Sequence, residues 1–79
     1  MGRRAYTSED RKILRALAAR LRTAREAAGL TQQHVADHIG ITRAGVAMFE
    51  GGNGSPSIPI LLAWARATKS TVADLVGTL

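Results

Sequence analysis

Side chains able to bind metal, move protons or attack a substrate are few in this sequence. His34 and His38 have the i, i+4 spacing at which two histidines on one helix face can ligate a metal ion. No third ligand is evident, and Asp37 does not complete an HExxH pattern, so we interpret both histidines as solvated. No nucleophile is paired with a base, no carboxylates cluster, and there is no cysteine. We therefore expect no enzyme, no metal site and no cofactor.

Arginine is the residue type with the most chemistry to offer here, and its distribution is uneven. The net charge is +5 over 79 residues. Residues 1–25 hold eight basic and two acidic side chains, a charge of +6, whereas residues 26–79 carry −1. Such asymmetry suits a polyanionic partner, either nucleic acid or an anionic membrane. The alternative is a charged face that only keeps the protein in solution.

The elements that position these residues are predicted to be helices of one small domain, since 79 residues fit no larger architecture. Apolar residues recur at helical spacing over residues 8–28, behind a capping Thr7 or Ser8. Thr31 can cap a second helix, which Gly40 closes, and Thr42 a third through Glu50. Only Ile41 separates Gly40 from Thr42, so these two short helices must meet at a sharp angle.

A true loop follows at residues 51–56, where three glycines and a proline cannot sustain a helix. Ser57 caps a fourth helix through about Thr68, and Thr71 a last short one. No stretch alternates with period two, so the predicted fold class is all-α. The longest apolar run is too short to span a bilayer, and no secretory leader is evident.

Two short helices joined by a tight turn, with longer helices on either side, describe a helix-turn-helix. From Leu17 to Val76 the sequence resembles the lambda-repressor-like (Cro/C1, XRE-type) family. The matching residues are Arg25, Gly29-Leu30-Thr31-Gln32, Val35-Ala36, Ile39-Gly40, Val46, Phe49-Glu50, Gly52, Pro56-Ser57, Leu61, Trp64-Ala65 and Leu75. The resemblance implies a five-helix fold. Ahead of the part that the family covers, the helical pattern predicts an extended first helix, so a domain at residues 8–79 follows a basic arm at residues 1–7.

The resemblance also implies binding of double-stranded DNA, with the third helix in the major groove. If Val46 and Phe49 face inward, the residues left to face base pairs are Thr42, Arg43, Ala44, Ala47 and Met48. Of these, Arg43 alone can make a bidentate contact to guanine, although it could instead bind a phosphate or stay solvated. Because this helix presents few polar groups, DNA shape is expected to carry part of the specificity. Gly45 weakens this helix, unless it relieves crowding between the two short helices.

Phosphate contacts are expected on both sides of the third helix. Gln32 matches the family position that binds a phosphate at the start of the second helix, where Thr31 and Gln33 stand beside it. After the third helix, Asn53, Gly54 and Ser55 either offer backbone N–H groups to a phosphate or form a plain turn. Arg25 and Glu50 match an ion pair inside the family's domain; the alternative for Arg25 is a direct phosphate contact.

Two further surfaces lie toward the chain ends. Arg3 and Arg4 could place guanidinium groups in a narrow minor groove, or form a tail that never touches DNA. Surplus apolar residues predict a modest two-fold contact, unless they only close the monomer core; they are Leu62, Val72, Leu75, Val76 and Leu79.

The function that follows is a sequence-specific regulator in the bacterial or phage-infected cytoplasm, acting as a repressor and as a homodimer on a palindromic operator. One alternative is an antitoxin-like module that mainly holds a partner protein. Another is a basic amphipathic helix acting at membranes. An enzyme is the least supported reading, for want of paired catalytic groups.

Overall fold

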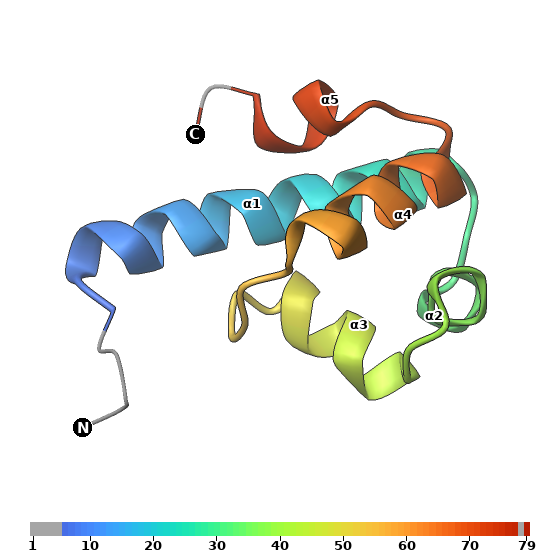
Figure 1. Cartoon of the computed structure of the whole chain (residues 1–79), viewed down its shortest axis with the longest axis horizontal. Coiled ribbons are helices and arrows are strands. Elements are labelled where there is room, and N and C mark those ends of the chain that lie inside the picture. Colours follow the sequence, from blue (N-terminus) through green and yellow to red (C-terminus); the bar gives the residue numbers. More distant parts are fainter. Residues whose placement is uncertain (1–5, 78) are drawn as a thin grey trace.

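Five helices account for most of the chain in the computed structural model, which describes residues 6–77 and 79 (Figure 1). No strand occurs among these residues, so the all-α class predicted from the sequence is confirmed. Each helix begins within one residue of the position predicted from its cap. The helices are α1 (Ser8–Ala27), α2 (Gln32–Ile39), α3 (Arg43–Glu50), α4 (Ile58–Thr68) and α5 (Val72–Val76).

A hydroxyl side chain starts every one of these helices. The Oγ atoms of Thr7, Thr31, Thr42, Ser57 and Thr71 each accept the backbone N–H three residues on, at 3.0–3.3 Å. Such caps satisfy amides that have no partner within a helix. Because caps follow one another at short intervals, the chain must turn between short helices.

Gly40 sets the turn between α2 and α3. Its φ of +88° lies in the left-handed region that glycine adopts without steric cost, and its N–H closes α2 on the Ala36 carbonyl at 2.8 Å. Only Ile41 and the cap Thr42 then precede α3. The two helices therefore pack against each other at an angle, with α2 seen nearly end-on beside α3 in Figure 1.

The core lies where α1 and α4 cross over the α2–α3 pair. Its largest fully buried side chains come from every helix: Leu21, Val35, Val46, Trp64 and Leu75. The Trp64 indole N–H donates to the Leu21 carbonyl at 3.1 Å, so its polar atom is satisfied inside the core. This packing fixes α3 with one side inward and the other free.

The first helix is longer than the core requires. Its buried residues are Leu17, Ala18 and Leu21, and the turns before them extend past α3 on the left of Figure 1. Within residues 6–77 and 79, no helix has the length and apolar character needed to cross a membrane.

Candidate nucleic-acid interface

The outer side of α3 carries the residues predicted to face DNA bases. Val46 is fully buried and Phe49 half-buried, as the assignment of the inner side requires. The exposed residues are the predicted ones, namely Thr42, Arg43, Ala44, Ala47 and Met48. Thr42 also caps the helix, since its Oγ1 accepts the Gly45 N–H at 3.0 Å. Apart from Arg43, this surface is small or apolar.

Gly45 does not relieve crowding between α2 and α3. A Cβ placed there would lie 3.4 Å from Thr42 Oγ1 and 3.5 Å from Ile41 Cδ1, which are ordinary contacts with the turn just before α3. That alternative for Gly45 is therefore wrong. The prediction that remains is that the glycine weakens α3.

Met48 joins the exposed side of α3 to the loop that follows. A Cβ on Gly54 would lie 3.0 Å from Met48 Cε, so the methionine side chain rests on the glycine backbone while staying 43% exposed. The α3–α4 loop is thus held beside α3, so its backbone N–H groups and side chains can contact the same partner as the helix.

The start of α2 presents backbone amides at the surface. The N–H groups of Gln32 and Gln33 occupy its first two positions and have no partner within the helix. The Thr31 N–H donates instead to His34 Nδ1 at 3.0 Å. The Thr31 N–H is thus bonded within the protein, whereas the Gln32 and Gln33 amides remain candidates for a phosphate.

A nearly buried ion pair joins the end of α1 to the end of α3, beside the start of α2. Arg25 Nε donates to Glu50 Oε2 at 2.6 Å and Arg25 Nη2 donates to Glu50 Oε1 at 3.0 Å, so the pair is bidentate. The two side chains are only 12% and 4% exposed. Arg25 Nη1 donates to the Leu30 carbonyl at 2.9 Å. Hydrogen bonding to Glu50 raises the pKa of Arg25 despite its partial burial, so the guanidinium stays charged.

Gln32 belongs to the same network. Its Nε2 donates to Glu50 Oε1 at 3.1 Å, so the side chain expected to bind a phosphate is tied to the last residue of α3. One amide hydrogen and the amide oxygen remain for another partner. The sequence did not indicate this bond, because it joins residues 18 positions apart.

The α3–α4 loop supplies fewer amides than expected. The Asn53 N–H donates to the Met48 carbonyl at 3.1 Å, so that backbone group is not available to a phosphate. Within the described part of the chain, no backbone bond engages the N–H groups of Gly54 and Ser55, and the Asn53 and Ser55 side chains are exposed. These groups follow the carboxyl end of α3, the same end at which Gln32 bonds to Glu50.

Several predicted residues fall elsewhere. Leu75 is fully buried and cannot lie on an interface, because it completes the core between α1 and α4. Val72 and Val76 pack partly against the same core, whereas Leu62 and Leu79 are 43% and 40% exposed. Arg3 and Arg4 lie outside the described residues. His34 and His38 are exposed on α2, and no group of three metal-ligating side chains occurs among the residues described.

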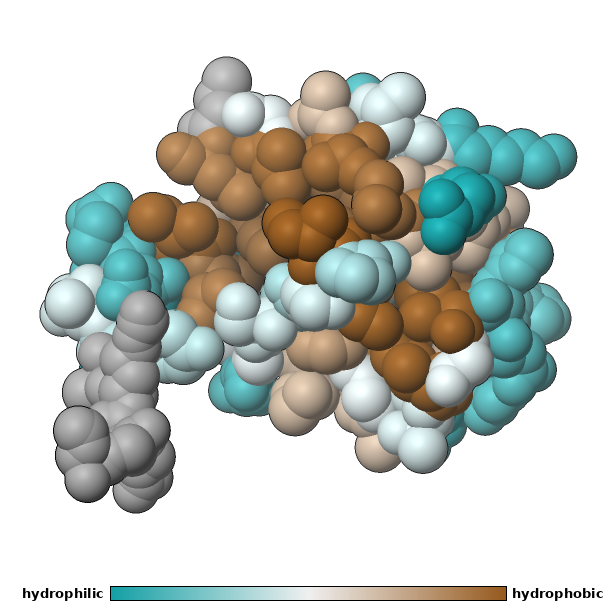
Figure 2. Space-filling view, in the orientation of Figure 1, coloured by the Kyte–Doolittle hydropathy of each residue, from teal (hydrophilic) through white to brown (hydrophobic). Residues whose placement is uncertain are grey.

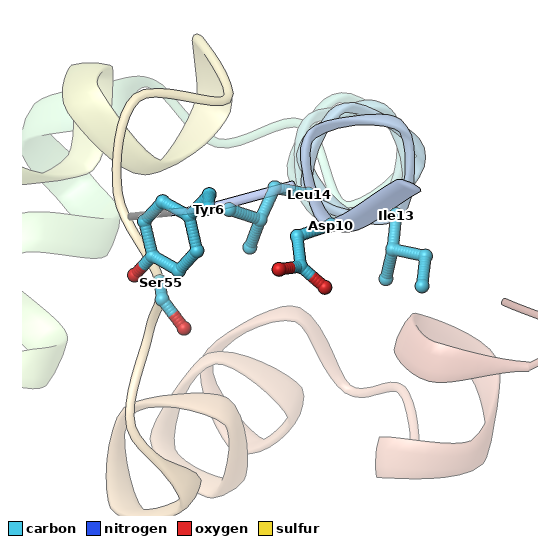
Figure 3. A pocket seen from close by; sticks show the side chains of 5 residues that line it. All are labelled: Tyr6, Asp10, Ile13, Leu14 and Ser55. Carbon is cyan, nitrogen blue, oxygen red and sulfur yellow. The ribbon is translucent and has the colours of Figure 1, made fainter. Parts of the chain in front are cut away.

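One part of the site escaped sequence reasoning. Tyr6 precedes α1 and lies over the α3–α4 loop beside Ser55, with Leu14 behind it (Figure 3). A hollow of about 220 Å³ lies on its Ile13 side, and another of about 270 Å³ on its Arg11 side. The excess of positive charge near the N-terminus was a signal available in the sequence. It did not show where the α3–α4 loop returns across α1.

A short helix with a free outer side, fixed by a second helix whose amino end is exposed, defines a helix-turn-helix domain. The chain belongs to the helix-turn-helix domain family, whose pattern matches residues 16–76, and it is of the Cro/C1 (XRE) type. The family resemblance read from the sequence is confirmed. Membership implies double-stranded DNA as the partner.

Solved structures agree with this assignment. The restriction-modification controller protein C.AhdI from Aeromonas hydrophila is 32% identical with a TM-score of 0.75, over 78% of this chain and 94% of that one. The clp gene regulator ClgR from Corynebacterium glutamicum is 26% identical with a TM-score of 0.78, over 81% and 68%. An HTH_3 family transcriptional regulator from Vibrio cholerae shares the fold, at 23% identity and TM-score 0.75, over 82% and 36%. No curated protein matches the sequence significantly.

Proposed function

We propose that this chain is a sequence-specific DNA-binding regulator that places α3 in the major groove. The observation that carries the proposal is the outer side of α3, where Arg43 and three apolar side chains stand exposed on a helix held by the Arg25–Glu50 pair. The proposed phosphate contacts are Gln32 and Gln33 at the start of α2 and Gly54 and Ser55 in the loop after α3. Phosphate contacts fix the position of the helix, and base contacts carry the sequence information.

Recovery of bound duplexes from random DNA tests this function. We expect enrichment of one sequence, with guanine at the position that Arg43 reads. A fixed helix that presents one arginine and small residues should read few base pairs, so the enriched half-site should be short. Binding of every duplex with equal affinity would contradict sequence-specific regulation, and no binding at all would contradict DNA binding.

We propose further that two copies bind together on a palindromic site. Large aliphatic side chains that are exposed outside α3, within the described part of the chain, are Ile58, Leu62, Leu79 and Ile13, at 66%, 43%, 40% and 39% exposure. Figure 2 shows apolar residues gathered over the first turns of α1, the start of α4 and α5. These elements are distinct from α3, so a second copy seated there would leave both recognition helices free. A two-fold contact of this kind uses the same surface on each copy.

Repression is the mode of action we propose. A small dimer that occupies an operator acts by covering DNA that other proteins need, and the proposed sites require only DNA and a second copy. This function places the protein in the cytoplasm with the chromosome. A reporter gene behind the selected operator should fall in expression when the protein is supplied; a rise would show activation instead.

A further inference from the structure

The hollow on the Arg11 side of Tyr6 has a cationic wall. Arg11 and Arg15 line it from α1, and Gly51, Gly52 and Asn53 line it from the α3–α4 loop. It measures about 270 Å³, whereas one water molecule occupies about 30 Å³ of the liquid. The hollow is therefore a groove between helix and loop that is wide enough for a polar group larger than water.

Among residues 6–77 and 79, no ion pair supplies Arg11 or Arg15 with a counter-charge. Other arginines of α1 are engaged: Arg22 pairs with Glu26 at 3.1 Å and Arg25 with Glu50 at 2.6 Å. For Arg11 and Arg15, the described part of the chain supplies neither an ion pair nor a side-chain hydrogen bond, and both are exposed. Like charges at i and i+4 on a helix repel each other. An anion between them would turn this repulsion into attraction.

The loop is held close to these arginines by Gly52. Its φ is +76°, and a Cβ there would lie 3.2 Å from Arg15 Cγ and 3.5 Å from Arg15 Cα. Only a residue without a side chain allows the backbone to approach α1 so nearly. The contact places Arg15 directly against the loop that follows α3. An anionic strand that follows this loop at Gly51, Gly52 and Asn53 would pass the hollow that Arg11 and Arg15 line.

We propose that this hollow binds a backbone phosphate of the DNA just outside the base pairs that α3 reads. The proposal rests on the proposed function and extends it. Guanidinium groups match phosphate oxygens with two parallel hydrogen bonds, and they remain charged at any physiological pH. Both arginines precede residues 16–76, the span of the family pattern, so this contact belongs to the part of α1 that lies ahead of that pattern.

The test compares two double variants of the full chain on the selected duplex. Arg11→Gln with Arg15→Gln removes two charges from the hollow, and Lys12→Gln with Arg66→Gln removes two exposed charges from other positions on α1 and α4. We expect the first variant to make the slope of log affinity against log salt shallower by about 1–2 per protomer, with base preference unchanged. The control variant should keep the wild-type slope. Arg11→Lys with Arg15→Lys, which keeps both charges, should also stay near it.

Neutral methylphosphonate groups placed one at a time along the duplex locate the contact. One flanking position should weaken binding of the wild type and leave the Arg11→Gln, Arg15→Gln variant unaffected. An unchanged slope, or an equal fall for both double variants, would overturn the proposal while selective DNA binding by the wild type still stands. If the glutamine variant fails to fold, the scan with the wild-type protein decides, since no sensitive flanking phosphate means no such site.

Discussion

Arg43 is the side chain on which base recognition depends most under the proposed function. Ala44, Ala47 and Met48 beside it on the outer side of α3 offer apolar contacts only, because their side chains have no hydrogen-bond donor. We expect Arg43→Ala to relax preference at one operator position by about 1–3 kcal/mol and to spare affinity for random DNA. Titrations on duplexes that carry each base at each position measure this. A uniform loss on all duplexes would assign Arg43 to a phosphate.

Glu50 is expected to act on stability rather than on DNA. Its carboxylate receives Arg25 and Gln32, so Glu50→Ala leaves a largely buried guanidinium without its counter-charge. Breaking such a pair from one side costs about 3–5 kcal/mol in the free energy of unfolding, measurable by urea titration. Glu26→Ala is the matched control, since its pair with Arg22 is more than half exposed and worth about 0.3–0.5 kcal/mol. Equal loss in the two variants would contradict a structural role for Glu50.

Single residues were predictable where their role is local. A threonine or serine followed by a helical pattern identifies a cap, and the sequence indicated all five, with Ser8 as the alternative to Thr7. The ion pair between Arg25 and Glu50 came only from family resemblance, because nothing local joins residues 25 positions apart. For the same reason the bond from Gln32 to Glu50 was missed. Leu75 was misplaced since a short apolar segment does not reveal which of its residues the core needs.

At the scale of the element, α3 can be stabilised without crowding. Gly45 lies in its first turn, where an added Cβ meets only ordinary contacts. We expect Gly45→Ala to raise the free energy of unfolding by about 0.5–1 kcal/mol, because glycine loses more backbone entropy on folding than alanine does. Thermal unfolding followed by circular dichroism measures it.

Gly40→Ala is the control for that substitution. Space is equally open there, but the φ of +88° strains any residue with a Cβ, so this variant should lose about 1–2 kcal/mol. If both variants shift stability in the same direction, backbone conformation is not what distinguishes the two glycines.

Elements were the most predictable level of this structure. Caps and apolar periodicity located all five helices, and the first was predicted one residue too long, through Ala28, which serves as its C-cap. What escaped prediction was how elements meet. The close approach of Gly52 to Arg15 and the packing of Met48 on Gly54 depend on the path of the loop, which periodicity does not describe.

At the scale of the whole molecule, the proposed DNA and dimer surfaces have only α1 in common. The first uses α3, the start of α2, the α3–α4 loop and the Arg11–Arg15 hollow. The second uses α4, α5 and the Ile13 side of α1, on the other side of Tyr6 and Leu14 from the two arginines. The extended α1 therefore contributes to both surfaces, one along each side of its first turns.

The dimer surface predicts a specific dependence on the DNA used. Ile58→Ser with Leu62→Ser removes two exposed apolar side chains of α4 that the core does not need, so the fold should persist. A lone helix-turn-helix reads few base pairs, and a pair reads two half-sites about 34 Å apart. We expect the variant to lose affinity for a duplex with two half-sites and to match the wild type on a duplex with one. Gel-shift stoichiometry and sedimentation on the two duplexes measure this. Should the wild type bind a single half-site as tightly as the pair, one protein per duplex, then the exposed residues of α4 serve another partner and two copies are not needed for recognition.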